Sequence, residues 1–201
     1  DCLLSRGLGD VYKRQGQGEV LTTPIQLANV TAAIANKGYF FTPHVLKKSN
    51  GKNITNPKYT TPKKTSIDSK YFDPIIEGMH EVFKTGTGKW SNIKGIDIVG
   101  KTGTSENFTV INGVRKQLKD HSILIAFAPK DNPKIAIAVF VENGGYGSTI
   151  AAPITSLLIE KYLHKKITGA NRKWVENNMI NLSLRDVYNE KDIIPKKEFK
   201  D

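Results

Sequence analysis

The fold is decided by the stretch His121–Asn143, which reads HSILIAFAPKDNPKIAIAVFVEN. It holds two nearly continuous runs of Ile, Val, Ala and Phe, at 121–129 and 134–143, which are typical of buried strands. The connector PKDNP between them has hairpin length, so we expect the two strands to be antiparallel neighbours. A third strand-like run, IDIVGKTGTS at 96–105, precedes them in the chain.

Three helices are expected around these strands. The first begins at the N-cap Thr23 and ends at Gly38, the second begins at the cap Asp73 and runs to about Lys84, and the third starts at about Ala151. The spacing of apolar residues predicts the buried face of each helix. These residues are Leu27, Val30 and Ile34, then Ile75, Ile76, Met79, Val82 and Phe83, and finally Ile154, Leu157, Leu158 and Tyr162.

The order of helix, helix, three strands and helix has no alternating βαβ units. It predicts an α+β fold in which helices pack on an antiparallel sheet. Residues 1–15 resemble a translated adapter junction and are expected to be non-native, so the domain is expected to span 16–164. The polar segment 165–201 is expected to be a peripheral tail, with one amphipathic helix through Trp174.

Composition and charge limit the possible classes of protein. The chain has 30 Lys and Arg against 19 Asp and Glu, but no zinc-ligand spacing or RNA-binding pattern accompanies this charge, so we expect no nucleic-acid partner. The single cysteine excludes an internal disulfide, and no apolar run is long enough for a membrane helix. Much of the excess charge should form a solvated, mobile face, at Lys47, Lys48, Lys52, Lys58, Lys63, Lys64 and Lys70.

The tetrapeptide KTGT occurs twice, at Lys84–Thr87 and at Lys101–Thr104. The first copy stands where the second helix must end, and Gly86 and Gly88 suit a helix-ending loop with left-handed backbone. The second copy lies in a strand. There, period-two alternation separates its lysine from its two hydroxyls, which can share a pocket only across the edge of the sheet.

Four other matches are interpreted as structural. The sequence Gly95–Thr102 fits the phosphate-binding pattern GxxxxGK[ST], but a strand lies between its glycines and no helix can follow. Ser49–Lys52 fits SxxK but contains a turn-forming Asn-Gly, and Ser105–Asn107 fits SxN but continues the strand. Asp120 and His121 could orient a general base, although a histidine beside an apolar strand is more often structural.

Several separated segments together resemble the C-terminal part of the transpeptidase domain of class B penicillin-binding proteins, especially those that serve cell elongation. They are, in order, GQGEVLTTPIQLANVTAAIANKGYFFTPHVLK, GKTGTSENF, DHSILIAFAPKDNPKIAIAVFVENGGYGS and AAPITSLLIEKYL. The resemblance implies a β-lactamase-like α+β fold and peptidoglycan D,D-transpeptidation through a serine acyl-enzyme. It implies neither a metal nor another cofactor.

By this resemblance the second KTGT is an active-site motif on the edge strand. Lys101 would supply positive charge and polarise the serine of the SxN motif. Thr102 and Thr104 would hold the carboxylate of a D-Ala-D-Ala stem peptide or of a β-lactam, with Gly103 between them. The backbone N–H of Thr104 would form half of an oxyanion hole.

The family's nucleophile and SxN motifs would lie before Gly16, so this chain alone is expected to be inactive. The parent protein is expected to be membrane-anchored, to act on the periplasmic face of the inner membrane, and to work with elongation proteins including a glycosyltransferase. Two alternatives stay open. One is a penicillin-recognising sensor or scaffold of the same fold, and the other is a basic binder of anionic polymers.

Overall fold

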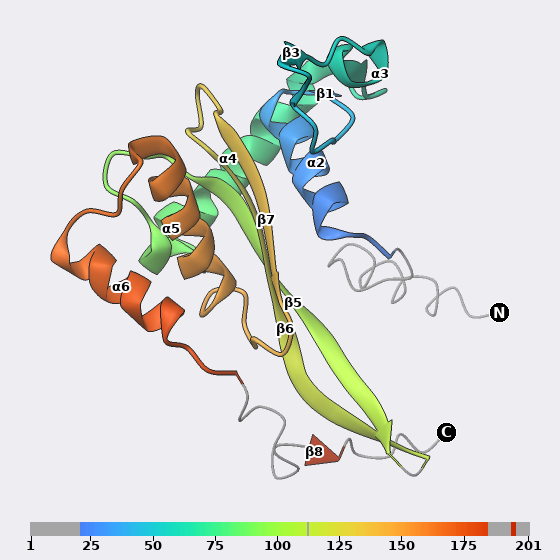
Figure 1. The fold of residues 1–201 in the computed structure, drawn as a ribbon. Coiled ribbons are helices and arrows are strands. Elements are labelled where there is room, and N and C mark those ends of the chain that lie inside the picture. Colours follow the sequence, from blue (N-terminus) through green and yellow to red (C-terminus); the bar gives the residue numbers. More distant parts are fainter. Residues whose placement is uncertain (1–20, 112, 185–193, 196–201) are drawn as a thin grey trace.

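The computed structural model describes residues 21–111, 113–184 and 194–195. Its centre is an antiparallel sheet of β5 (Val99–Ile111), β6 (Val114–Ala128) and β7 (Ile135–Val141) in the order β5-β6-β7, with the short β8 (Ile194–Pro195) against β6. Figure 1 shows helices on both faces of this sheet. The α+β class and the antiparallel pairing of β6 with β7 are therefore confirmed. The stretch 1–15 lies outside the described residues.

The first expected helix is α2 (Pro24–Ala35), and its start is as predicted. The Thr23 hydroxyl accepts the Gln26 N–H, and the Gln26 side chain accepts the Thr23 N–H, which forms a capping box. At the other end two successive residues have positive φ, Lys37 with 52° and Gly38 with 108°. The amides of both bond back to the last turn of the helix, as in a Schellman motif.

The second expected helix is preceded by a 3-10 turn, η1 (Ser69–Tyr71), and then continues as α4 (Phe72–Lys84). The prediction that Asp73 caps it is wrong, because the chain is already helical one residue earlier. Asp68 caps the 3-10 turn, accepting the Lys70 N–H, and Asp73 lies 2.7 Å from the ammonium of Lys37. This ion pair links the start of α4 to the end of α2.

The third helix, α5 (Ala151–His164), begins where predicted but has no side-chain cap of its own. Instead the hydroxyl of Ser122, on β6, accepts the Ala151 N–H at 3.1 Å and donates to the Tyr146 carbonyl at 2.9 Å. The further helix expected through Trp174 is α6 (Ala170–Ile180).

The predicted buried faces are partly wrong. Val30, Ile75, Leu158 and Tyr162 are exposed. Smaller side chains occupy the faces toward the sheet, and on α2 and α5 the buried ones include Thr31, Ala33, Ala151, Ala152, Thr155 and Ser156. Short side chains let a helix approach a sheet closely, which a scan for large apolar residues overlooks.

Strands β5 and β6 run beyond their predicted ends at 105 and 121. They continue as a two-stranded ribbon that leaves the body of the molecule and in which the pairing extends to Ile111 and Val114 (Figure 1). A register shift between Ser105 and Asn107 marks where the ribbon begins. The alternating, β-branched sequence of this segment supports strand structure although one face has no core beneath it.

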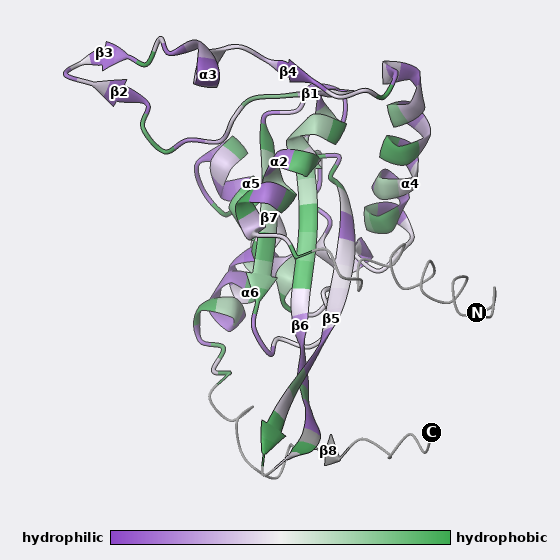
Figure 2. Ribbon diagram, turned by 90° about the vertical axis from the view of Figure 1, so that its right-hand side faces the viewer, coloured by the Kyte–Doolittle hydropathy of each residue, from purple (hydrophilic) through white to green (hydrophobic). Residues whose placement is uncertain are grey.

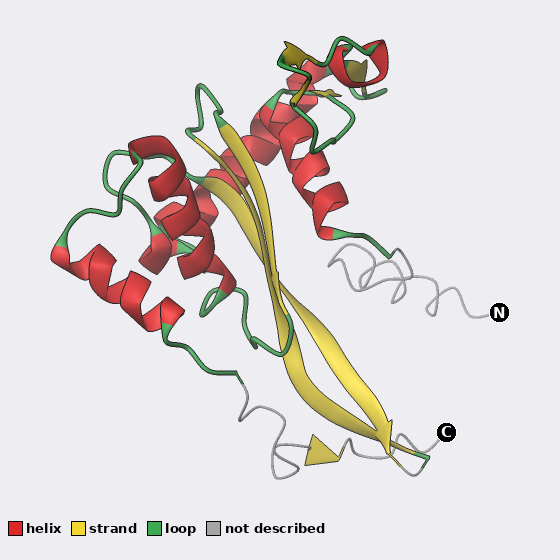
Figure 3. Cartoon of the chain, in the orientation of Figure 1, coloured by secondary structure: helices red, strands yellow, loops and turns green. Residues whose placement is uncertain are grey.

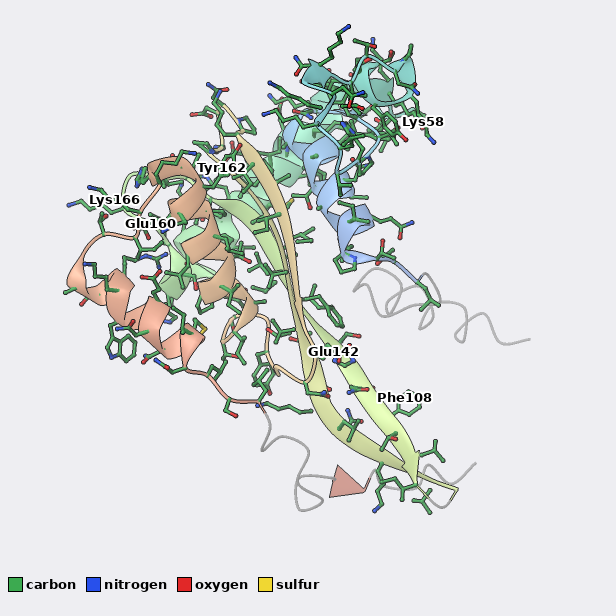
Figure 4. The ribbon with its side chains drawn as sticks, in the orientation of Figure 1. Lys58, Phe108, Glu142, Glu160, Tyr162 and Lys166 are labelled. Carbon is green, nitrogen blue, oxygen red and sulfur yellow. The ribbon has the colours of Figure 1, made fainter. Side chains whose placement is uncertain are left out.

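The lysine-rich segment forms a small satellite above α2 (Figure 3). In it β1 (Tyr39–Phe40) pairs with β4 (Lys63–Lys64), β2 (Lys48–Ser49) pairs with β3 (Lys52–Asn53), and α3 (Pro57–Thr60) lies between. All seven lysines named above are exposed, as expected of a solvated face.

The core lies on both sides of the sheet, where Figure 2 shows hydrophobic colour along β6 and β7. On one face Phe72, Ile76 and Met79 of α4 pack with Val99 and Phe127. The opposite face packs against α5, and its cluster contains Phe83 together with Leu124, Ala126, Ala151, Ala152 and Ile159. The C-terminal end of α4 therefore reaches the α5 side of the sheet next to β5.

Candidate functional site

The second KTGT lies on β5, which in the described part of the sheet pairs with β6 alone. The strand pairing puts Lys101 and Gly103 opposite Ile125 and Ile123, and Thr102 opposite Leu124. The lysine side chain bends along the strand so that its ammonium donates to the Thr102 carbonyl at 2.8 Å. The ammonium thus stays at the edge of the sheet and bonds the backbone of the residue that carries the first hydroxyl of the motif.

The Lys101 ammonium is exposed, and within the described residues it makes no ion pair with a carboxylate. Lys84 of the first copy differs, because its ammonium bonds Glu81 one turn earlier at 3.3 Å. The two lysines with the same flanking letters therefore have different surroundings. Only Lys101 presents its charge beside the strand edge without a carboxylate neighbour.

The first KTGT ends α4, as predicted, with Thr85 as the C-cap. Its glycines are required for a reason other than the one expected, because neither Gly86 nor Gly88 has a positive φ. A Cβ on Gly86 would lie 2.8 Å from the Cα of Val82, and one on Gly88 would lie 3.2 Å from the ring of Phe83. Close approach to the helix, not left-handed backbone, excludes larger residues here.

The tight turn carries the last residue of the first copy onto the second copy. The hydroxyls of Thr87 and Thr102 are 2.8 Å apart, a hydrogen-bond distance in which either can donate. Sequence reasoning gave Thr87 no role beyond the turn. Nothing in the sequence marks a contact between residues fifteen positions apart, which the packing of α4 against β5 produces.

A third segment, the loop 144–150 before α5, approaches the strand from the α5 side. A Cβ on Gly147 would overlap the Gly103 carbonyl and lie 2.5 Å from the Ile123 carbonyl, so this position requires glycine. The Gly147 amide is 3.4 Å from the Thr104 hydroxyl, to which it donates. A Cβ on Gly103 itself would make only an ordinary contact with Ile123 at 3.4 Å.

The motifs interpreted as structural have the local structure expected of them. Residues 101–104 are strand, which a phosphate-binding loop does not allow, and Ser49 precedes a hairpin turn at Asn50 and Gly51. The ring of His121 accepts the Asn143 N–H at Nδ1, while Asp120 accepts a bond from Gln117. The aspartate and histidine therefore do not form an orienting pair.

A cavity of about 720 Å³ lies beyond the KTGT strand, at the base of the ribbon. It is lined by residues of three segments, Glu106, then 117–120, then 144–146 with Thr149 and Ile150. The KTGT residues do not line it. In the described ranges no group of three His, Cys, Asp or Glu side chains is placed to hold a metal ion, and no helix is long and apolar enough to cross a membrane.

The arrangement on β5 is chemically suited to an anion. The ammonium of Lys101, two hydroxyls that bond each other, and a third hydroxyl that accepts a glycine N–H come from four residues of strand and two adjoining loops. A carboxylate accepts charge-assisted hydrogen bonds from such donors, and these are stronger than neutral ones. The strand edge also offers backbone groups to an extended peptide.

Comparison with known proteins identifies the family. Residues 9–160 match the family described as the penicillin binding protein transpeptidase domain, which is most of the chain. The protein therefore belongs to the penicillin-binding protein transpeptidase family.

Individual relatives agree with this assignment. The chain is 36% identical over 146 residues to the peptidoglycan D,D-transpeptidase MrdA of Acinetobacter baumannii, covering 68% of this chain and 22% of that protein. Its structure is similar to that of Pseudomonas aeruginosa PBP2 in complex with WCK 5153, with a TM-score of 0.63, 33% identity, and coverage of 81% of this chain and 34% of that one. It is also similar to the penicillin G acyl-enzyme complex of Mycobacterium tuberculosis penicillin-binding protein A, with a TM-score of 0.57, 32% identity, and coverage of 74% and 33%.

The matched part of each relative is small. The chain spans about a quarter of the length of the curated relatives that it matches. It therefore corresponds to a portion of a transpeptidase domain in proteins that contain much more sequence.

Proposed function

We propose that this chain is the C-terminal part of a peptidoglycan D,D-transpeptidase of the cell-elongation type, which cross-links stem peptides through a serine acyl-enzyme. The observation that carries the proposal is the exposed Lys101 ammonium on the β5 edge, on the same short run of strand as the Thr102 and Thr104 hydroxyls. This is the position where an extended peptide ending in a carboxylate finds both charge and strand-edge hydrogen bonds.

Each residue of the motif has a role in this proposal. Lys101 supplies positive charge beside the reacting serine and polarises the serine of the SxN motif. Thr102 and Thr104 bind the terminal carboxylate of D-Ala-D-Ala, or that of a β-lactam, and Gly103 lies between them in the substrate-binding strand. The Thr104 N–H stabilises the tetrahedral oxyanion together with the N–H of the nucleophile.

The nucleophile is proposed to lie upstream of this chain, because the SxxK match at Ser49 stands on a hairpin turn instead of a helix start. The parent protein is proposed to be anchored in the inner membrane, to act on its periplasmic face, and to work with a glycosyltransferase and other elongation proteins. No cofactor enters the proposed reaction. The chain is proposed to consist of a non-native junction at 1–15, the transpeptidase part at 16–164 and a polar tail at 165–201.

Labelling by fluorescent penicillin tests the proposal in the full-length protein. We expect stable labelling of the wild type and none of the 201-residue chain alone. Lys101→Ala should slow acylation by about a hundredfold, on the scale of one preorganised group that stabilises the transition state. Lys84→Ala is the matched control from the first KTGT and should acylate at nearly the wild-type rate.

Three outcomes would contradict the proposal. An unlabelled wild type would remove the penicillin-binding function, and equal effects of the two lysine variants would remove the choice of motif. Acylation without transfer of a D-Ala-D-Ala donor to an acceptor strand would indicate a sensor or scaffold of the same fold.

A further inference from the structure

We propose that Thr87, in the first KTGT, is a positioning residue for the carboxylate site of the second KTGT and orients the hydroxyl of Thr102 toward the bound anion. This inference rests on the proposed function. It extends the site from one strand to a second segment that is 15 residues earlier in the chain.

The hydrogen bonds available to Thr87 and Thr102 lead to this assignment. Their hydroxyl oxygens are 2.8 Å apart, and within the described residues neither hydroxyl has another partner. A hydroxyl carries one proton, so a pair has two, and the bond between them uses one. The other proton is available to a ligand. If Thr87 donates to the Thr102 oxygen, the Thr102 proton is the one that faces outward from the strand.

The position of Thr87 is fixed by its surroundings and is not that of a loose surface side chain. Gly86 and Gly88 fold the loop onto the last turn of α4, and the amides of both donate to carbonyls of that turn at 3.0 and 2.9 Å. Phe83, which is 1% exposed, packs against both Gly88 and Gly100. The loop after α4 and the strand β5 therefore both pack against the Phe83 ring. This contact fixes the two hydroxyls relative to each other before a ligand binds.

The charge at this place identifies the ligand class. The Lys101 ammonium bonds the Thr102 carbonyl at 2.8 Å, so a positive charge is held on the same residue whose hydroxyl pairs with Thr87. A donated bond polarises the acceptor hydroxyl and strengthens the bond that it donates in turn. In a series of hydrogen bonds from Thr87 to Thr102 and from Thr102 to a ligand, a carboxylate is therefore bound more strongly than an uncharged group.

The test uses the full-length protein and measures the second-order rate constant of acylation by fluorescent penicillin and by its methyl ester. Thr87→Val removes the hydroxyl at constant shape, and we expect about a tenfold slower reaction with the free acid. With the ester, which lacks the carboxylate charge, the variant and the wild type should differ by less than twofold. Thr87→Ser should restore most of the rate.

Two further variants separate positioning from direct binding and from general damage. Thr102→Val should be slower than Thr87→Val, and the double variant should react no more slowly than Thr102→Val alone. Thr85→Val is the matched control, because the Thr85 hydroxyl bonds Glu81 and not β5. It should leave the rate and the unfolding temperature unchanged.

The possible results are distinct. A wild type that penicillin does not label overturns the proposed function and this inference with it. A labelled wild type with a normal Thr87→Val rate overturns only the inference. Equal losses with acid and ester, or additive losses in the double variant, would show that Thr87 does not act on the carboxylate through Thr102.

Discussion

The ring of Phe83 lies 2.9 Å from the place that a Cβ on Gly100 would occupy. The same hypothetical Cβ would lie 2.6 Å from the Ile125 carbonyl, so Gly100 leaves no room for any side chain. Phe83 thereby fits against the strand just before Lys101. The glycine that completes a false match to a phosphate-binding pattern is explained by this contact.

Replacement of Gly100 by alanine is expected to destabilise the domain. The added methyl group would force the backbone of β6 or the Phe83 ring to move, at a cost of about 1–3 kcal/mol. Gly78→Ala is the control, because a Cβ there meets nothing within 4 Å and the residue lies inside α4. That variant should be as stable as the wild type or more so. Thermal unfolding of the full-length protein measures both, and equal unfolding temperatures would contradict the packing argument.

Replacement of Gly147 by alanine should impair acylation more than stability. A side chain at this position collides with the backbone of Gly103 and Ile123, so the loop or the KTGT strand must shift. A displacement of 1 Å at a catalytic constellation can reduce the rate on the order of a hundredfold. Gly78→Ala, inside α4 where a Cβ meets nothing within 4 Å, is the control away from the site. Penicillin acylation rates should fall only for the Gly147 variant.

The polar tail helix α6 is held by a buried ion pair. Arg172 donates to Glu160 at 2.7 Å and to the Ser156 hydroxyl at 3.0 Å, and the Glu160 side chain is only 3% exposed. Arg172→Ala leaves that carboxylate buried with bonds from Thr168 but without its charged partner, which should cost about 3–5 kcal/mol. Lys173→Ala, at an exposed position of the same helix, should cost nearly nothing.

Hydrogen exchange provides the second measurement on α6. In the Arg172 variant the amides of 170–180 should exchange faster than in the wild type, because the helix loses its attachment to α5. The double variant Glu160→Gln with Arg172→Met should recover part of the lost stability, since it removes the unpaired charge. Unchanged stability in the single variant would contradict the claim that this ion pair stabilises the attachment of α6.

The pair of Glu77 and Lys130 should make stability depend on pH. A hydrogen bond from Lys130, 2.6 Å away, lowers the pKa of Glu77 below its ordinary value of 4.5, and the same bond raises the pKa of Lys130 above 10.5. The contribution of the carboxylate is therefore present above its ordinary pKa and is lost as the pH falls through the lowered one. The contribution of the lysine is lost as the pH rises through its raised pKa.

Glu77→Gln should accordingly be slightly less stable than the wild type at pH 7, and the difference should vanish as the pH falls through the lowered pKa of Glu77. Both side chains are partly exposed, so the effect should shrink in 1 M salt, where the screening length falls to about 3 Å. Adding Lys130→Gln to Glu77→Gln should cause no further loss at pH 7. Unfolding temperatures across the pH range measure the effect, and a constant difference between variant and wild type would contradict it.

The sequence predicted the positions of the helices and strands better than the faces that the helices bury. Runs of apolar residues located β6 and β7, and cap residues located α2, because these signals are local. The buried faces were predicted less well, since Val30 and Tyr162 fit the helical period but point away from the sheet. Which side of a helix meets a sheet depends on elements that are far away in the sequence, and small residues mark it more reliably here.

The candidate site shows the same division. The strand context of Lys101–Thr104 was predictable. The alternation of side chains can be read from a few neighbouring residues, and the family resemblance identified the motif. The contributions of Thr87 and Gly147 were not, since each depends on where a loop lies after α4 and β7 have packed. A tertiary contact between two hydroxyls leaves no pattern in a single sequence.

The hydroxyl of Ser122 makes two later segments of the chain depend on the central strand β6. Because α5 has no cap among its own residues and takes one from β6, its first turn is incomplete until the central strand is in place. The loop that carries Gly147 is anchored by the same hydroxyl through the Tyr146 carbonyl. The first turn of α5 and the loop that backs Thr104 therefore depend on the same serine.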